Sequence, residues 1–68
     1  MELDEALDFI EKCFASGEEF WFRDKRYKFG PPNYFHRGKL FVKSGSTWES
    51  STVSVIELIR HREELEKI

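Results

Sequence analysis

The chain has 68 residues, of which 40% are hydrophobic and 35% charged, and its formal net charge is −2 at pH 7. A chain this short cannot close two separate cores, so residues 1–68 are predicted to form one domain. The single cysteine, Cys13, excludes an internal disulfide and suits a reducing compartment. No run approaches the roughly 20 apolar residues of a membrane span, and the acidic start is unlike a secretion signal. We therefore expect a soluble cytoplasmic protein with no membrane partner.

The near-neutral total charge hides a polarity along the chain. Residues 1–19 carry seven acidic side chains and one basic one, whereas residues 20–43 carry seven basic and one acidic. The sequence pI of about 5.6 argues against a dedicated nucleic-acid-binding protein, yet the middle third alone is strongly basic.

The first segment has apolar residues at the helical spacing of three and four. They are Leu3, Leu7, Ile10 and Phe14, with Ala6 and Cys13 beside the same stripe. Acidic residues in the first turns suit the helix dipole, and Ser16-Gly17 supplies a left-handed stop. The pattern predicts an amphipathic helix over residues 3–15.

Residues 20–29, Phe-Trp-Phe-Arg-Asp-Lys-Arg-Tyr-Lys-Phe, have two aromatic runs around a charged centre, which is typical of a tight hairpin. A two-residue loop centred on Arg23-Asp24 or on Asp24-Lys25 puts even positions of the first strand and odd positions of the second on one face. That face carries Phe20, Phe22, Tyr27 and Phe29. The opposite face carries Trp21, Arg23, Arg26 and Lys28, so the hairpin offers one apolar and one cationic surface.

Gly30-Pro31-Pro32-Asn33 ends this hairpin, because proline cannot donate to a sheet ladder. A second turn is predicted at Arg37-Gly38. It places Phe35 opposite Leu40, with Val42 on the same face, and the other face then carries Tyr34, Lys39, Phe41 and Lys43. Residues 44–46, Ser-Gly-Ser, indicate a further reversal, after which residues 47–49 are expected to form a short last strand.

Two helix-start signals coincide near residue 54. Ser54 with Glu57 makes a capping box, and Val53 with Leu58 makes the hydrophobic staple around it. The predicted helix presents Val55, Leu58, Ile59 and Leu65 to a core, and its exposed pairs at the helical spacing are Arg60 with Glu64, Arg62 with Glu66 and Glu63 with Lys67. The β-branched run of residues 52–56 suits a strand equally well, so that stretch stays open between a strand and a helix start.

These elements predict an α+β fold in the order helix, three or four strands, helix. Both terminal helices have an apolar stripe, and the sheet has one apolar face, so we expect the helices to pack together on that face of a small antiparallel sheet.

Few residues suggest catalytic or metal chemistry. Glu57, His61 and Glu64 share a helical stripe, but it lies opposite the apolar one and faces water, so no metal site is predicted. Cys13 has no basic neighbour in the sequence, which indicates a buried structural thiol rather than a nucleophile. Dinucleotide fingerprints, paired zinc-ligand motifs and hydrolase elbows are missing. We therefore expect no cofactor and no enzymatic activity.

The outer side of the predicted sheet alternates aromatic rings with cations, a chemistry that suits phosphates and stacked bases. Its candidate binding residues are Trp21, Arg23, Arg26, Lys28, Tyr34, Lys39, Phe41 and Lys43. Three interpretations stay open. In the first, the basic stems cover the rings and keep an edge of the sheet soluble, or a helix lies over this face. In the others, a protein binds here, or single-stranded nucleic acid or a nucleotide binds here.

The opening Glu-Ala-Leu-Asp-Phe-Ile-Glu, the step from Gly17 to Phe20 and the hairpin up to Phe29 resemble small uncharacterised proteins of bacteriophages and prophages. The resemblance covers residues 5–29 and departs at the turn, where Arg23-Asp24 replaces the usual Asn-Gly. It implies an accessory protein of a mobile element, of a kind that often binds and inhibits a host protein, and it assigns no catalytic residue.

Size, the missing catalytic motifs and the aromatic residues expected at the surface together favour a non-catalytic protein-binding module. The resemblance would make its partner a host protein. Binding of single-stranded nucleic acid or a nucleotide on the basic aromatic face is the alternative, and a homodimer would also bury that face.

Overall fold

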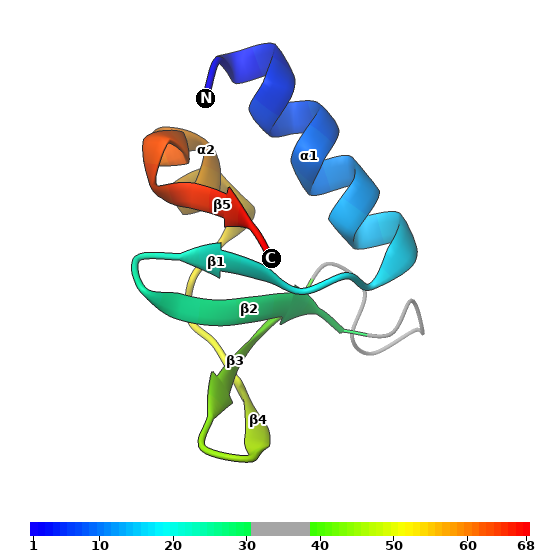
Figure 1. The fold of residues 1–68 in the computed structure, drawn as a ribbon, viewed down its shortest axis with the longest axis vertical. Coiled ribbons are helices and arrows are strands. Elements are labelled where there is room, and N and C mark those ends of the chain that lie inside the picture. The colour runs from blue at the N-terminus through cyan, green and yellow to red at the C-terminus, as the bar shows by residue number, and fades with distance from the viewer. Residues whose placement is uncertain (31–38) are drawn as a thin grey trace.

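The structure, a computed structural model, describes residues 1–30 and 39–68 of the chain. Its elements in order are helix α1 (Leu3–Ser16), strands β1 (Phe20–Phe22), β2 (Lys25–Phe29), β3 (Leu40–Ser44) and β4 (Thr47–Ser50), helix α2 (Val55–Arg60), the 3-10 turn η1 (Arg62–Glu64) and strand β5 (Leu65–Lys67). The strands form one five-stranded antiparallel sheet in the order β4-β3-β2-β1-β5. Figure 1 shows α1 and α2 on the same side of the β1–β2 hairpin, so the predicted α+β arrangement is confirmed.

The first hairpin turns at Arg23-Asp24, one of the two predicted loops. Phe22 pairs with Lys25, and both turn residues have positive φ angles, 51° and 62°, as a type I′ turn requires. This register puts Phe20, Phe22, Tyr27 and Phe29 on one face, where each is at most 6% exposed. The predicted apolar face of the hairpin is therefore confirmed, and we call it the inner face of the sheet.

Helix α1 confirms part of the predicted stripe, since Ala6, Ile10 and Cys13 are buried, but the helix is rotated away from its leucines. Leu3 and Leu7 are 44% and 46% exposed, whereas Ala6 and Phe9 are buried. The Phe9 ring meets the Phe20 ring edge to face, with centroids 5.9 Å apart. The larger aromatic ring decides the rotation of the helix, because it buries more area than a leucine at the rim. The predicted end is confirmed at Gly17, where φ is 75° and the N–H donates to the Cys13 carbonyl.

Strand β3 continues the sheet on the far side of β2. Phe29 pairs with Leu40 and Tyr27 with Val42, which places Leu40 and Val42 on the inner face as predicted. The reversal after Ser44 is also confirmed, and β4 follows it. The predicted Arg37-Gly38 turn, the pairing of Phe35 and the face of Tyr34 lie outside the described residues.

The C-terminal segment departs most from the prediction. Ser54 caps α2 as expected, since its Oγ accepts a hydrogen bond from the Glu57 N–H at 3.3 Å, so residues 55 onward begin a helix rather than a strand. The helix stops at Arg60, however, and residues 65–67 form a fifth strand beside β1. Leu65 pairs with Phe22 and is 4% exposed. The predicted helical pairs Arg62 with Glu66 and Glu63 with Lys67 are therefore wrong.

The reason for this strand is the edge of β1. Without β5, the strand Phe20–Phe22 would be an edge strand, and the backbone N–H and C=O groups on its edge would be unpaired beside the core. Pairing with β5 satisfies them and also brings Leu65 onto the inner face, opposite Phe22.

The buried residues come from both helices and from four of the strands, and they form one cluster. It contains Ala6, Phe9, Ile10, Cys13, Phe20, Phe22, Tyr27, Phe29, Leu40, Leu58 and Leu65. Because α1 and α2 both contribute to it, the opposite face of the sheet is left for other contacts.

Candidate functional site

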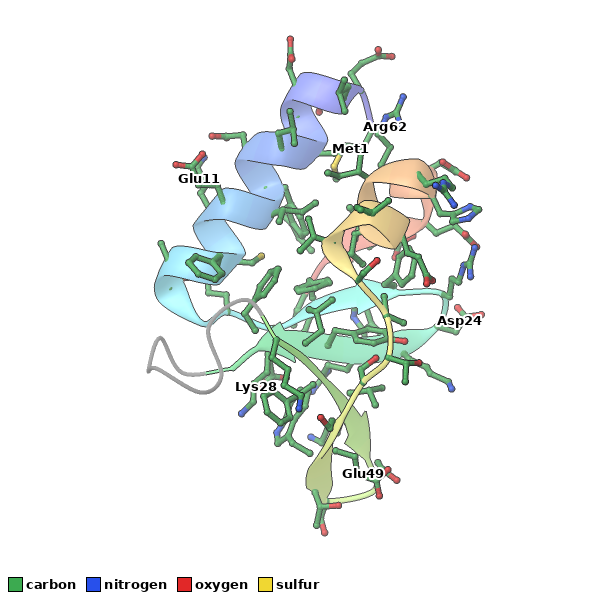
Figure 2. All side chains as sticks on the ribbon, turned by 180° about the vertical axis from the view of Figure 1, so that it is seen from behind. Met1, Glu11, Asp24, Lys28, Glu49 and Arg62 are labelled. Carbon is green, nitrogen blue, oxygen red and sulfur yellow. The ribbon has the colours of Figure 1, made fainter. Side chains whose placement is uncertain are left out.

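The side of the sheet that faces away from the helices is called the outer face here. Alternation along the strands assigns to it Trp21 of β1, Arg26 and Lys28 of β2, Phe41 and Lys43 of β3, Trp48 of β4 and Glu66 of β5. Figure 2 shows Lys28 on the opposite side of the sheet from α1. Both tryptophans are half-buried, so their rings are partly open to a ligand.

Each tryptophan of the outer face holds a cation against its ring. The Lys28 Nζ atom lies 4.4 Å from the Trp48 ring centroid, and the Arg26 guanidinium carbon lies 4.9 Å from the Trp21 ring centroid. Cation–π contacts at exposed sites contribute about 0.5 to 1 kcal/mol. They therefore favour these positions of the Lys28 and Arg26 side chains, which a ligand can still displace.

The strand register places five of these side chains in one row across the sheet. Glu66 pairs with Trp21, Trp21 with Arg26, and Lys43 with Trp48. Arg26 and Lys43 both lie one residue beyond the Tyr27–Val42 pair, on the same side of it, so they are neighbours. The row across the outer face therefore reads Glu66, Trp21, Arg26, Lys43, Trp48.

Arg26 is the central cation of this row and is incompletely paired. Its Nη1 atom lies 3.4 Å from Glu19 Oε1, while its Nε atom is shielded from solvent and has no hydrogen-bond partner within the described part of the chain. Arg26 therefore contributes positive charge beside the Trp21 ring, while its shielded Nε atom is not open to a ligand.

Arg23, predicted for the same surface, is placed elsewhere. Its Nε donates to Glu64 Oε2 at 2.8 Å, and its guanidinium lies 5.2 Å from the ring of Phe22, an inner-face residue. The hydrogen bond to Glu64 raises the pKa of Arg23. Arg23 therefore joins the hairpin to η1 instead of extending the cationic surface.

The other predicted binding residues are placed as follows. Trp21, Arg26, Lys28, Phe41 and Lys43 come together on the outer face, Lys39 is exposed directly before β3, and Tyr34 lies outside the described residues. Trp48 was missed as a site residue. The signal was available, because a strand over residues 47–49 that pairs with Lys43 puts Trp48 on the same face as that lysine.

A hollow of about 510 Å³ adjoins the Trp21 end of the row. It is lined by Trp21, Arg23, Asp24, Glu63, Glu64 and Glu66. This end of the surface is therefore acidic, in contrast to the cations over β2 and β3.

His61, Glu63 and Glu64 lie near this hollow with one possible ligand atom each, all within 4.8 Å of one another. The predicted stripe of Glu57, His61 and Glu64 is not kept as a helical stripe, because α2 ends at Arg60. Glu64 is already bonded to Arg23, and Glu63 is 67% exposed, so these groups form an ordinary solvated cluster and we assign no metal to them.

Cys13 is buried at 3% exposure on the inner side of α1. Burial raises the pKa of its thiol, and the charge of Glu18 raises it further. A nucleophilic cysteine needs the opposite shift, toward the thiolate, so Cys13 is a core side chain.

Comparisons of the chain with models of protein families, with curated proteins and with solved structures give no match. Neither helix within residues 1–30 and 39–68 has the length and apolar character needed to cross a membrane. The resemblance to bacteriophage proteins accordingly stays a prediction.

Proposed function

We propose that the protein is a small non-catalytic binding module that holds single-stranded nucleic acid on the outer face of its sheet. The observation that supports this best is the pairing of each outer tryptophan with a cation, Lys28 with Trp48 and Arg26 with Trp21. Proteins that bind single strands combine a cationic surface along the phosphates with aromatic rings on which bases stack.

The choice of cations favours a polyanion over a protein as the ligand. Protein interfaces are enriched in tryptophan and arginine but depleted in lysine. The cationic surface here includes the lysines Lys28, Lys39 and Lys43, and an ammonium group suits phosphate as a point charge.

The cation–π contacts do not block stacking, as their magnitude indicates. Stacking of a base on an aromatic side chain contributes about 1 to 3 kcal/mol, more than the cation–π contact that it would replace. A base arriving at Trp48 can therefore displace Lys28, whose flexible side chain then reaches a phosphate.

The acidic charges of α1 do not cancel this attraction. They belong to a helix that packs on the inner face, and electrostatic interactions in water decay over about 8 Å at physiological ionic strength. On the outer face itself, Glu19 Oε1 lies 3.4 Å from Arg26 Nη1 and partly neutralises this arginine, so the attraction for a strand comes mainly from Lys28 and Lys43.

A salt titration of binding to a labelled dT12 oligonucleotide and to rU12 tests the proposal. Lys43→Gln should lower the slope of log affinity against log salt by roughly 0.7, the value of one single-strand phosphate contact. Trp48→Ala should weaken binding by about 1 to 3 kcal/mol with little change in slope. Lys12→Gln, which removes a cation from exposed α1, is the matched control and should leave both quantities unchanged.

Wild-type protein that fails to bind either oligonucleotide at low salt would end the proposal. A loss of affinity in Lys12→Gln as large as that in Lys43→Gln would also contradict it, because the attraction would then come from overall charge rather than from the outer face.

A second candidate function, binding of another protein, is favoured by apolar residues on the helical side. Leu3 and Leu7, one helical turn apart on α1, are 44% and 46% exposed, and Ile56 of α2 is 65% exposed. A host protein in the cytoplasm, which the phage resemblance would suggest, or a second copy of the chain could cover them. Light scattering checks the homodimer directly: if a dimer forms through these residues, Leu7→Glu should convert it to monomer while Trp48→Ala does not.

A further inference from the structure

We infer that a bound single strand crosses the β-strands along one row of side chains, from Trp48 to Trp21, and that carboxylates beyond Trp21 end the site. The inference rests on the proposed function, because it specifies where and how the same outer face holds its ligand. Its basis is the row Glu66, Trp21, Arg26, Lys43, Trp48, which the strand register defines.

The row has a tryptophan at each end of a cationic centre. Trp21 on β1 and Trp48 on β4 are separated by three strand spacings, which is about 14 Å along the sheet. Arg26 and Lys43 lie between them, where the phosphates that join two stacked bases would pass. The row therefore places two cations between two rings, which matches two stacked bases joined by the phosphates that lie between them.

The spacing sets the size of the site. Stacked nucleotides rise about 3.4 Å each, so two bases about 14 Å apart are about four positions apart in a stacked strand and fewer in an extended one. The strand thus fits bases on Trp21 and Trp48 with one to three nucleotides between them. This is close to the lower limit of the roughly 4 to 16 nucleotides that comparable sheet surfaces hold.

The acidic side chains give the row a defined end. Glu66 lies next to Trp21 across the β1–β5 pair, and Asp24, Glu63 and Glu64 line the hollow beyond it. Phosphates are repelled by these carboxylates, so the strand does not continue over β5. At the other end β4 is the last strand of the sheet, and a longer oligonucleotide can leave past Trp48.

The first test uses abasic oligonucleotides that carry only two thymines, separated by zero to six abasic nucleotides. Wild type should bind best with one to three abasic nucleotides between the thymines. In Trp21→Ala the affinity should fall by about 5- to 150-fold, the range expected for one lost stack, and the preference for a spacing should disappear. Equal affinity at all spacings would overturn the inference.

The second test reverses the charge of one side chain in the row. Glu66→Lys should extend the cationic row and raise the salt slope for dT12 by roughly 0.7, as one added phosphate contact does. Glu11→Lys makes the same change in net charge on α1, on the helical side of the molecule (Figure 2), and should leave the slope unchanged. Equal responses of the two variants would show that no carboxylate boundary exists at β5.

The two tests distinguish failure of the row from failure of the proposed function. If wild type binds dT12 but shows neither a spacing preference nor a response to Glu66→Lys, the row is wrong while the proposed function stands. If wild type binds no oligonucleotide at low salt, both fall.

Discussion

The two faces of the same sheet are both rich in aromatic residues, but their rings contact different partners. On the inner face the Phe20 ring centroid lies 5.9 Å from that of Phe9 and 6.2 Å from that of Tyr27. On the outer face, the rings of Trp21 and Trp48 each meet a cation instead. Adjacent residues of one three-residue strand, Phe20 and Trp21, therefore belong to two different environments.

Solvation explains this difference. A ring face is attractive to a cation anywhere, but a lysine or arginine taken into a dry core loses hydration that one ring cannot replace. Rings in the core therefore meet mainly other rings, and Arg23, whose guanidinium lies 5.2 Å from the buried Phe22 ring, keeps its own side chain exposed. Rings at the surface meet cations whose charged ends remain hydrated. The inner face is thus expected to determine stability, and the outer face to determine binding.

The largest difference in stability is expected between two variants that each remove one aromatic ring, one on the inner face and one on the outer face. Phe20→Ala should destabilise the fold by about 3 to 5 kcal/mol, because a ring that is 1% exposed leaves a cavity. Trp48→Ala should cost only about 1 kcal/mol, since its ring is half-buried and loses mainly its contact with Lys28. Urea unfolding followed by circular dichroism measures both, and equal losses would contradict the division between the faces.

The second prediction concerns β5, the edge strand that the sequence pattern did not predict. Leu65→Ala should cost about 2 to 5 kcal/mol, because Leu65 is buried against the inner face opposite Phe22. Its neighbour Glu66 points to the outer face, so Glu66→Ala should change stability by less than about 0.5 kcal/mol. The same unfolding assay applies, and a Leu65→Ala variant as stable as Glu66→Ala would disprove β5.

The turn that joins β1 to β2 offers a stabilising change of smaller size. Asp24 has a φ of 62°, which costs a residue with a side chain about 1 kcal/mol and costs glycine little. Asp24→Gly should therefore raise the free energy of unfolding by up to about 1 kcal/mol. Lys25→Gly, one residue further into β2, is the control and should lower it by about 0.5 to 1 kcal/mol.

The smallest effect is a pH dependence on the inner side. Burial raises the pKa of the Cys13 thiol, with a contribution from Glu18, so the folded protein keeps a proton that the unfolded chain has lost. The stability that Cys13 contributes is therefore complete below about pH 8.5 and declines as the pH rises further. The difference in unfolding free energy between wild type and Cys13→Ala should shrink from pH 7.5 to about pH 10. A constant difference would show that the thiol does not titrate in this way.

The candidate site was partly predictable from sequence. The alternation within residues 20–29 assigned Trp21, Arg26 and Lys28 to the outer face, and that assignment needed only a two-residue loop. Arg23 could not be placed in this way, because its partner Glu64 is 41 residues away in the chain. Trp48 could be placed only through its pairing with Lys43.

The sequence by itself determined the elements whose causes are local. The period of two in the hairpin, the cap at Ser54 and the glycine after α1 each act within a few residues, and the structure contains all three. The tertiary structure alone decided how α1 is rotated and that residues 65–67 form a strand, where the local pattern indicates a helix. Both depend on partners distant in the chain: Phe9 packs on the Phe20 ring, and Leu65 pairs along the open edge of β1. A local sequence pattern cannot predict either contact.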